Sequence, residues 1–141
     1  MENPFLSFDC RTTGTLRSNL ADFRYALRKF EAFSAAEAAS VGLTPQQHQT
    51  LLTISGAALG TATIGYIAER MLQKPHSATG VIDRLETLGL VFRHQSMKDR
   101  RVHLLELTER GTHVLRQLSA NHRAEIRRLR PRLAELLEML D

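Results

Sequence analysis

The sequence contains little that would stabilise a small secreted fold or hold a chain in a membrane. Its 141 residues include one cysteine, Cys10, so no disulfide can form within the chain, and a reducing compartment such as the cytoplasm is expected. No apolar run approaches the roughly 18–20 residues that span a bilayer, and no signal peptide is recognised at the beginning. These absences disfavour a membrane protein and a disulfide-stabilised secreted domain.

Motifs for catalysis and metal binding are also missing from the sequence. It has no Gly-rich phosphate-binding loop and no nucleophile elbow. Its six histidines form no His-x3-His pair, and one cysteine cannot form a Cys-x2-Cys pair. We therefore expect no enzymatic activity, no cofactor and no local metal site.

Positive charge is absent from one long stretch and concentrated in another. No lysine or arginine occurs from Glu31 to Glu69, whereas Arg70 to Arg132 contains 14 Lys and Arg against 6 Asp and Glu. The formal net charge of +4 therefore hides a strongly basic second half. A cationic surface of this kind is typical of a protein that binds a polyanion such as DNA, with a merely solvated basic face as the alternative.

The chain length suits one domain, or one domain with an appended helical arm, and the apolar pattern predicts mainly helices. Leu16, Leu20, Phe23, Leu27 and Phe30 recur every three or four residues, which is typical of a helix that packs lengthwise on other helices. Further on, the Thr-Pro-Gln-Gln segment at 44–47 contains a capping box that begins another helix. Helices are predicted over residues 15–40, 45–55, 63–72 and 76–88, with glycines after the first and the last.

The pattern then changes to two short strands. Leu90–Arg93 and Val102–Leu107 predict a β-hairpin whose basic tip lies between them. Thr108 is expected to cap a final helix, which Pro131 breaks or kinks before a last short helix over 132–141. We predict a mainly α fold with a hairpin wing, divided into an N-terminal dimerisation arm and helix (1–42), a winged helix-turn-helix (43–110) and C-terminal dimerisation helices (111–141).

A helix-turn-helix followed by a basic hairpin places two groups of side chains toward DNA. The second helix of the pair presents the residues of its N-terminal turns to the major groove, and the hairpin tip suits phosphates or the minor groove. The exposed candidates on the helix are Lys74, His76, Ser77 and Thr79, and those on the tip are Lys98, Arg100 and Arg101. For Arg84, a phosphate contact and a structural ion pair with Asp83, Glu86 or Glu69 remain equally open.

Several segments together resemble the MarR (multiple antibiotic resistance regulator) family of bacterial transcription factors. They are Ile67-Ala-Glu-Arg-Met71, Val81-Ile-Asp-Arg-Leu-Glu-Thr-Leu-Gly-Leu-Val91, Asp99-Arg-Arg101 and Leu107-Thr-Glu-Arg-Gly111. The resemblance covers nearly the whole chain, and its most specific element is Asp-x-Arg followed by Leu-Thr-x-x-Gly.

The resemblance implies a homodimeric repressor that reads a pseudo-palindromic operator in double-stranded DNA. It implies that Arg101 enters the minor groove while Asp99 holds it by a salt bridge. It also implies an effector, often an anionic aromatic molecule, bound between the dimer helices and the winged domain, for which Tyr25 and His48 are our candidates. The predicted DNA-binding residues are Lys74, His76, Ser77, Thr79, Arg84, Lys98, Asp99, Arg100 and Arg101.

Two positions depart from the family pattern, and two alternative functions stay open. Leu72-Gln73 stands where the family often has Gly-Leu, and Gly80 stands where it often has a long polar side chain. Gly80 either permits close approach of DNA or another helix, or leaves base recognition to Ser77 and Thr79. The alternatives are a redox-sensing regulator acting through Cys10 and a winged helix that binds another protein.

Overall fold

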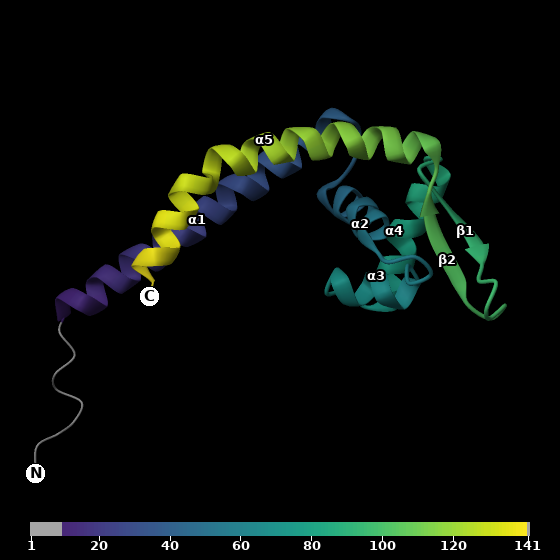
Figure 1. The fold of residues 1–141 in the computed structure, drawn as a ribbon, viewed down its shortest axis with the longest axis horizontal. Coiled ribbons are helices and arrows are strands. Elements are labelled where there is room, and N and C mark those ends of the chain that lie inside the picture. Colours follow the sequence, from purple (N-terminus) through teal and green to yellow (C-terminus); the bar gives the residue numbers. More distant parts are fainter. Residues whose placement is uncertain (1–9, 141) are drawn as a thin grey trace, which may run out of the picture. The chain divides into compact units, whose positions relative to one another are not determined.

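The computed structural model describes residues 10–140, with side chains from residue 14 onward, and the chain divides into two units. Unit 1 comprises residues 1–34 and 122–141, and unit 2 comprises residues 35–121. The elements are α1 (Cys10–Ser40), α2 (Pro45–Gly56), α3 (Ile64–Arg70), α4 (Pro75–Thr87), β1 (Val91–Gln95), β2 (His103–Leu107) and α5 (Glu109–Met139), as Figure 1 shows. The prediction of a mainly helical winged helix-turn-helix is confirmed.

The predicted start of α2 is confirmed in both halves of its capping box. The backbone N–H of Gln47 donates to Thr44 Oγ1 at 3.2 Å, and the backbone N–H of Thr44 donates to Gln47 Oε1 at 3.0 Å. Gly42 precedes this cap with φ at +77°, as a glycine that ends α1 should. Two of the N–H groups that a helix start leaves unpaired are thereby satisfied.

Unit 2 has its own apolar core, built from α2, α3, α4 and the hairpin together with the end of α1 and the beginning of α5. Leu51, Ile67, Ile82 and Leu85 are completely buried in it. The small Ala68 and Ala78, also buried, allow α3 and α4 to approach closely. The strands pair antiparallel with Val91 opposite Leu107, and β1 packs against α4.

The start of α5 is fixed against the end of α4 by the Leu-Thr-x-x-Gly segment. Thr108 caps α5 by accepting a hydrogen bond from the Gly111 N–H at 3.0 Å, and it donates its hydroxyl proton to the Gly89 carbonyl at 2.7 Å. A Cβ on Gly111 would lie 2.1 Å from the carbonyl oxygen of Leu90, so only glycine fits there. This segment therefore joins the end of α4 to the start of α5.

The C-terminal region corrects one expectation. Pro131 does not break the helix, and no separate short helix follows it: α5 continues from Glu109 to Met139 with Pro131 inside it. The proline removes one backbone hydrogen bond, but packing of the last turns against α1 outweighs that loss. Leu136 is fully buried, Asn19 donates to the Met139 carbonyl at 3.4 Å, and Arg132 pairs with Asp22 at 3.5 Å.

Unit 1 consists of parts of α1 and α5, and it buries little apolar surface of its own. Phe30 and Phe33 contact the His122 ring edge-on, and His122 Nε2 lies 2.8 Å from Ser34 Oγ. The leucines of the predicted stripe stay exposed, however, with Leu16 and Leu20 each 46% exposed. In the described part of the chain, no helix is long and apolar enough to cross a membrane.

Candidate nucleic-acid interface

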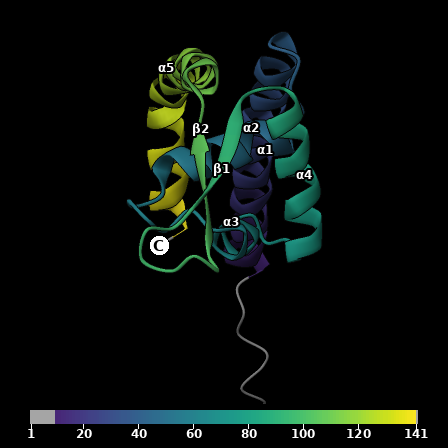
Figure 2. The same ribbon diagram turned by 90° about the vertical axis from the view of Figure 1, so that its right-hand side faces the viewer.

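The beginning of α4 and the tip of the wing lie on the same side of unit 2. Both views of the ribbon place the loop between β1 and β2 at the end of the unit where α3 turns into α4 (Figures 1 and 2). The structure therefore brings together the two groups of residues that the sequence predicts for DNA contact. A helix end and a hairpin tip on one face can reach a groove and the neighbouring backbone together.

The exposed turns of α4 begin without a side-chain cap. Lys74 occupies the N-cap position and makes no capping hydrogen bond, and Pro75 fills the first turn. Lys74, His76 and Ser77 are all exposed, so their side chains and the free N–H groups of the first turn face solvent. This arrangement is suited to a phosphate or to base edges.

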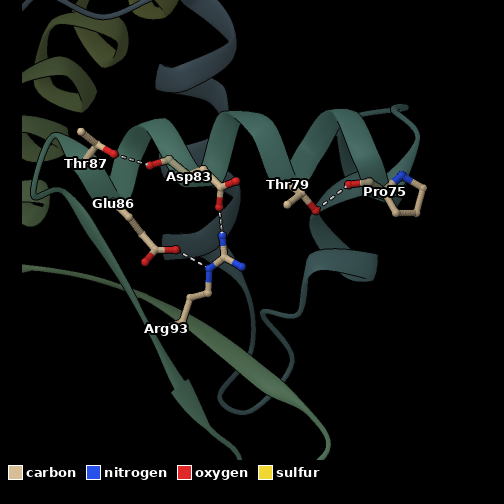
Figure 3. A network of polar contacts seen from close by, with 6 residues as sticks. All are labelled: Pro75, Thr79, Asp83, Glu86, Thr87 and Arg93. Carbon is tan, nitrogen blue, oxygen red and sulfur yellow. Dashed lines mark hydrogen bonds and ion pairs between the residues drawn. The ribbon is translucent and has the colours of Figure 1, made fainter.

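The hydroxyl group of Thr79 already makes a hydrogen bond within α4. Its hydroxyl donates to the Pro75 carbonyl at 2.9 Å (Figure 3), so only its oxygen lone pairs remain for an external donor. A Cβ on Gly80 would meet nothing within 4 Å. No other part of the described chain therefore requires glycine at position 80, which removes close approach of another helix within the chain as its explanation.

Arg101 at the wing tip is positioned by Asp99 through three hydrogen bonds. The Arg101 backbone N–H and Nε donate to Asp99 Oδ1 at 3.0 and 3.1 Å, and the NH2 group donates to Oδ2 at 3.1 Å. The Arg101 side chain nevertheless remains 89% exposed. The side-chain hydrogen bond from Arg101 lowers the pKa of Asp99 below its usual value, so the carboxylate is charged at neutral pH.

The turn at the wing tip is itself held by hydrogen bonds. The Ser96 N–H donates to the Val102 carbonyl at 2.9 Å, and the Val102 N–H donates to the Asp99 carbonyl at 3.0 Å. Lys98 and Arg100 are exposed on this turn. Three cations thus extend from a short hydrogen-bonded loop, which is a suitable geometry for phosphates.

Arg93 is the residue that sequence reasoning missed. It lies on β1 and donates to Asp83 and Glu86 of α4, two of the three carboxylates that the sequence offered to Arg84 (Figure 3). Among the residues that the structure describes, Arg84 makes no ion pair, and its side chain is exposed. The spacing of Asp83 and Glu86 predicts that both carboxylates lie on one face of the helix, but it does not identify the strand residue that pairs with them.

The two effector candidates belong to different units. Tyr25 lies in unit 1, is 60% exposed and has Lys29 Nζ 5.3 Å from its ring centroid. His48 lies in unit 2 and is buried. A pocket of about 320 Å³ in unit 2, beside β2 and the segment after α2, includes neither residue in its lining. Their effector role remains a prediction.

The side chain of Cys10 falls outside the part whose side chains are described. Among the described residues, no three His, Cys, Asp or Glu side chains converge as ligands for a metal ion.

Comparison with known proteins places the helix-turn-helix and wing of this chain among those of bacterial transcriptional regulators. The sequence model of the MarR family matches residues 41–102, which include α2, α3, α4 and β1. The chain is 37% identical over 83 residues to the HTH-type transcriptional repressor MdtR of Bacillus subtilis, a match that covers 59% of this chain and 52% of MdtR. The chain therefore spans about half the length of this curated relative.

Solved structures match over more of the chain. The YusO protein from Bacillus subtilis is 30% identical with a TM-score of 0.62, and the match covers 84% of each chain. A MepR F27L mutant of S. aureus, solved bound to an oligodeoxyribonucleotide, has a TM-score of 0.67 at 17% identity, covering 84% of this chain and 95% of MepR. The latter likeness concerns the fold alone.

The family model covers the helix-turn-helix and the first strand of the wing, and the solved structures share the fold over most of the chain. The matched relative is named a regulator of transcription and not an enzyme, as the missing catalytic motifs led us to expect. This chain belongs to the MarR family.

Proposed function

We propose that the protein is a homodimeric transcriptional repressor that binds a pseudo-palindromic operator through α4 and the wing. The observation that carries this proposal is Arg101, which is held by Asp99 and yet 89% exposed. It belongs to the loop between β1 and β2, and this loop lies on the same side of unit 2 as the start of α4 (Figure 2). A guanidinium fixed in this way loses little conformational freedom on entering the minor groove. The DNA-bound MepR structure supports the same use of the fold.

Exposed apolar side chains on unit 1 support the homodimer. Tyr25, Leu27, Ile126 and Leu137 are 39–60% exposed, in addition to the leucines near the start of α1. Apolar stripes at helical spacing on two adjacent helices are buried when a second helix pair packs against them. A second copy of this chain supplies such a pair and places two reading units on one duplex, one per half-site.

The proposal also includes repression of transcription and release of the operator when a small molecule binds the protein. The repressor name of MdtR supports the direction of regulation. Release requires that the effector bind better to a dimer geometry that does not match grooves about 34 Å apart. Residues Tyr25 and His48 are the candidates for contacting it.

Selection from a random-sequence DNA pool tests the proposal because it requires no assumed operator sequence. The wild-type protein should enrich an inverted repeat, and fluorescence anisotropy should show at least tenfold tighter binding to that duplex than to a scrambled one, which corresponds to about 1.4 kcal/mol. Equal binding of both duplexes would contradict the repressor function and favour the protein-interaction alternative. A pool selection that enriches single half-sites would contradict the dimer alone.

A further inference from the structure

The guanidinium of Arg93, on the first strand of the wing, forms ion pairs with both carboxylates of α4, the second helix of the helix-turn-helix. Arg93 Nε donates to Glu86 and its NH2 group donates to Asp83, as Figure 3 shows from close by. The Arg93 side chain is 27% exposed, whereas that of Asp83 is 60% exposed. The two acidic residues lie about one helical turn apart and therefore face β1 together.

Without Arg93, the charge of α4 would oppose DNA binding. The helix contains one cation, Arg84, against the two carboxylates of Asp83 and Glu86. A helix that enters a groove lies between two rows of phosphates, and uncompensated carboxylates there are repelled over a distance of about a Debye length. The pairing with Arg93 offsets this charge and leaves Arg84 outside the pair.

We propose that Arg93 is a positioning residue for DNA binding. It offsets one of the two carboxylate charges of α4, so that with Arg84 the helix presents no net negative charge to the phosphates. The inference rests on the proposed function. It assigns Arg93 an electrostatic role, because Nε and one terminal NH2 group of its guanidinium donate to α4 and its side chain is only 27% exposed.

A charge-rescue series separates this role from a purely structural bridge. In Arg93→Gln, the selected duplex should bind about tenfold more weakly at low salt, and the defect should shrink as salt screens the two carboxylates. Adding Asp83→Asn and Glu86→Gln to that variant should restore affinity to at least the wild-type level, since α4 then retains Arg84 and no carboxylate faces the phosphates. Arg93→Lys, which retains the charge but loses the planar fork, should bind nearly as wild type does.

Each contrary result would overturn the proposal. A triple variant as weak as Arg93→Gln would show that the bridge acts only by holding the wing to α4. A direct phosphate contact would reduce the magnitude of the slope of log affinity against log salt by about 0.9 in Arg93→Gln relative to wild type. The triple variant would not recover that slope. Thermal unfolding of every variant separates lost binding from lost folding.

Arg128→Gln is the matched control. It removes the same formal charge and another arginine–carboxylate pair, that with Glu125 at 2.5 Å, but it lies in unit 1. Its DNA affinity should change far less than that of Arg93→Gln. If the wild-type protein itself does not distinguish the selected duplex from a scrambled one, the proposed function fails, whereas normal wild-type binding with no effect of Arg93→Gln refutes the present inference alone.

Discussion

At the scale of single residues, the structure distinguishes side chains that fix the fold from side chains that remain free to meet a ligand. Thr108 and Gly111 belong to the first kind, because one caps α5 and the other permits its contact with Leu90. Arg101 belongs to the second, since its partner Asp99 orients it without covering it. Substitutions at these positions should therefore affect different measurements.

Arg101→Ala should weaken operator binding by about 1–3 kcal/mol while leaving the fold intact. The exposed guanidinium contributes nothing to the core, so thermal stability should stay within about 0.5 kcal/mol of wild type. Anisotropy titrations at several salt concentrations provide the measurement. Arg123→Ala, an exposed arginine of α5 in unit 1, is the control; equal losses in both variants would remove the wing from the mechanism.

Asp99 should titrate below the value of about 3.9 that an unperturbed aspartate shows. Because the Arg101 hydrogen bond lowers its pKa in the fold, the pair is fully formed above the unfolded value and is lost as pH falls through the lowered folded value. NMR detection of the Asp99 carboxyl carbon checks this. DNA affinity should show no inflection from this group between about pH 5 and 8. In Arg101→Ala the titration should return toward the ordinary aspartate value.

Leu72→Gly should stabilise the protein by about 0.5–1 kcal/mol. Leu72 has φ at +53°, a left-handed conformation that is unfavourable for leucine, and its side chain is 94% exposed, so no burial is lost. Urea unfolding should show a higher midpoint with an unchanged slope. Leu59→Gly is the matched control, being fully exposed without a positive φ; it should be neutral or destabilising, and a similar gain there would rule out relief of strain.

At the scale of elements, sequence reasoning located helices and strands well where the signals are local. The α2 capping box, the glycine stop after α1 and the two strands depend on neighbouring residues, and each is present. Pro131 was misjudged because its local penalty is outweighed by packing of the α5 end on α1. The Arg93 pairing was missed because it joins residues on two elements and has no local signature.

Two glycines at helical positions should respond oppositely to alanine. Gly111→Ala should destabilise by more than about 2 kcal/mol, because the new Cβ would collide with the Leu90 backbone. Gly80→Ala, with open space around its Cβ, should stabilise α4 by up to about 1 kcal/mol. Denaturant unfolding checks both. If Gly80→Ala stabilises the fold but weakens DNA binding, then the DNA backbone approaches α4 at that residue; a destabilised Gly80→Ala would contradict the helix argument.

At the scale of the whole molecule, the two units differ in how far they bury their apolar side chains. Unit 2 has a buried core of its own, with Leu51, Ile67 and Ile82 fully covered. The described part of unit 1 is a helix pair with exposed leucines, which a single chain leaves uncovered. The sequence predicted the stripe on α1, but no single chain shows which molecule covers it.

Light scattering should report a dimer at micromolar concentration. Replacing both Leu16 and Leu20 by serine should shift the protein toward a monomer, because two apolar contacts, each about 1–3 kcal/mol when buried, are lost from each copy. Circular dichroism should show that unit 2 remains folded. Leu52→Ser, at a residue 49% exposed on α2 in unit 2, is the control and should remain dimeric; a wild-type monomer would contradict the assembly.

The division into units also has a genetic consequence. Unit 2 is one continuous stretch of the chain, residues 35–121, whereas unit 1 is assembled from both ends. A premature stop codon after residue 121 would delete the C-terminal part of unit 1 and leave the coding sequence of unit 2 whole. Late nonsense alleles of this gene are therefore expected to abolish assembly without abolishing the fold of the winged helix-turn-helix. Mutations within residues 35–121 are not expected to separate these two effects.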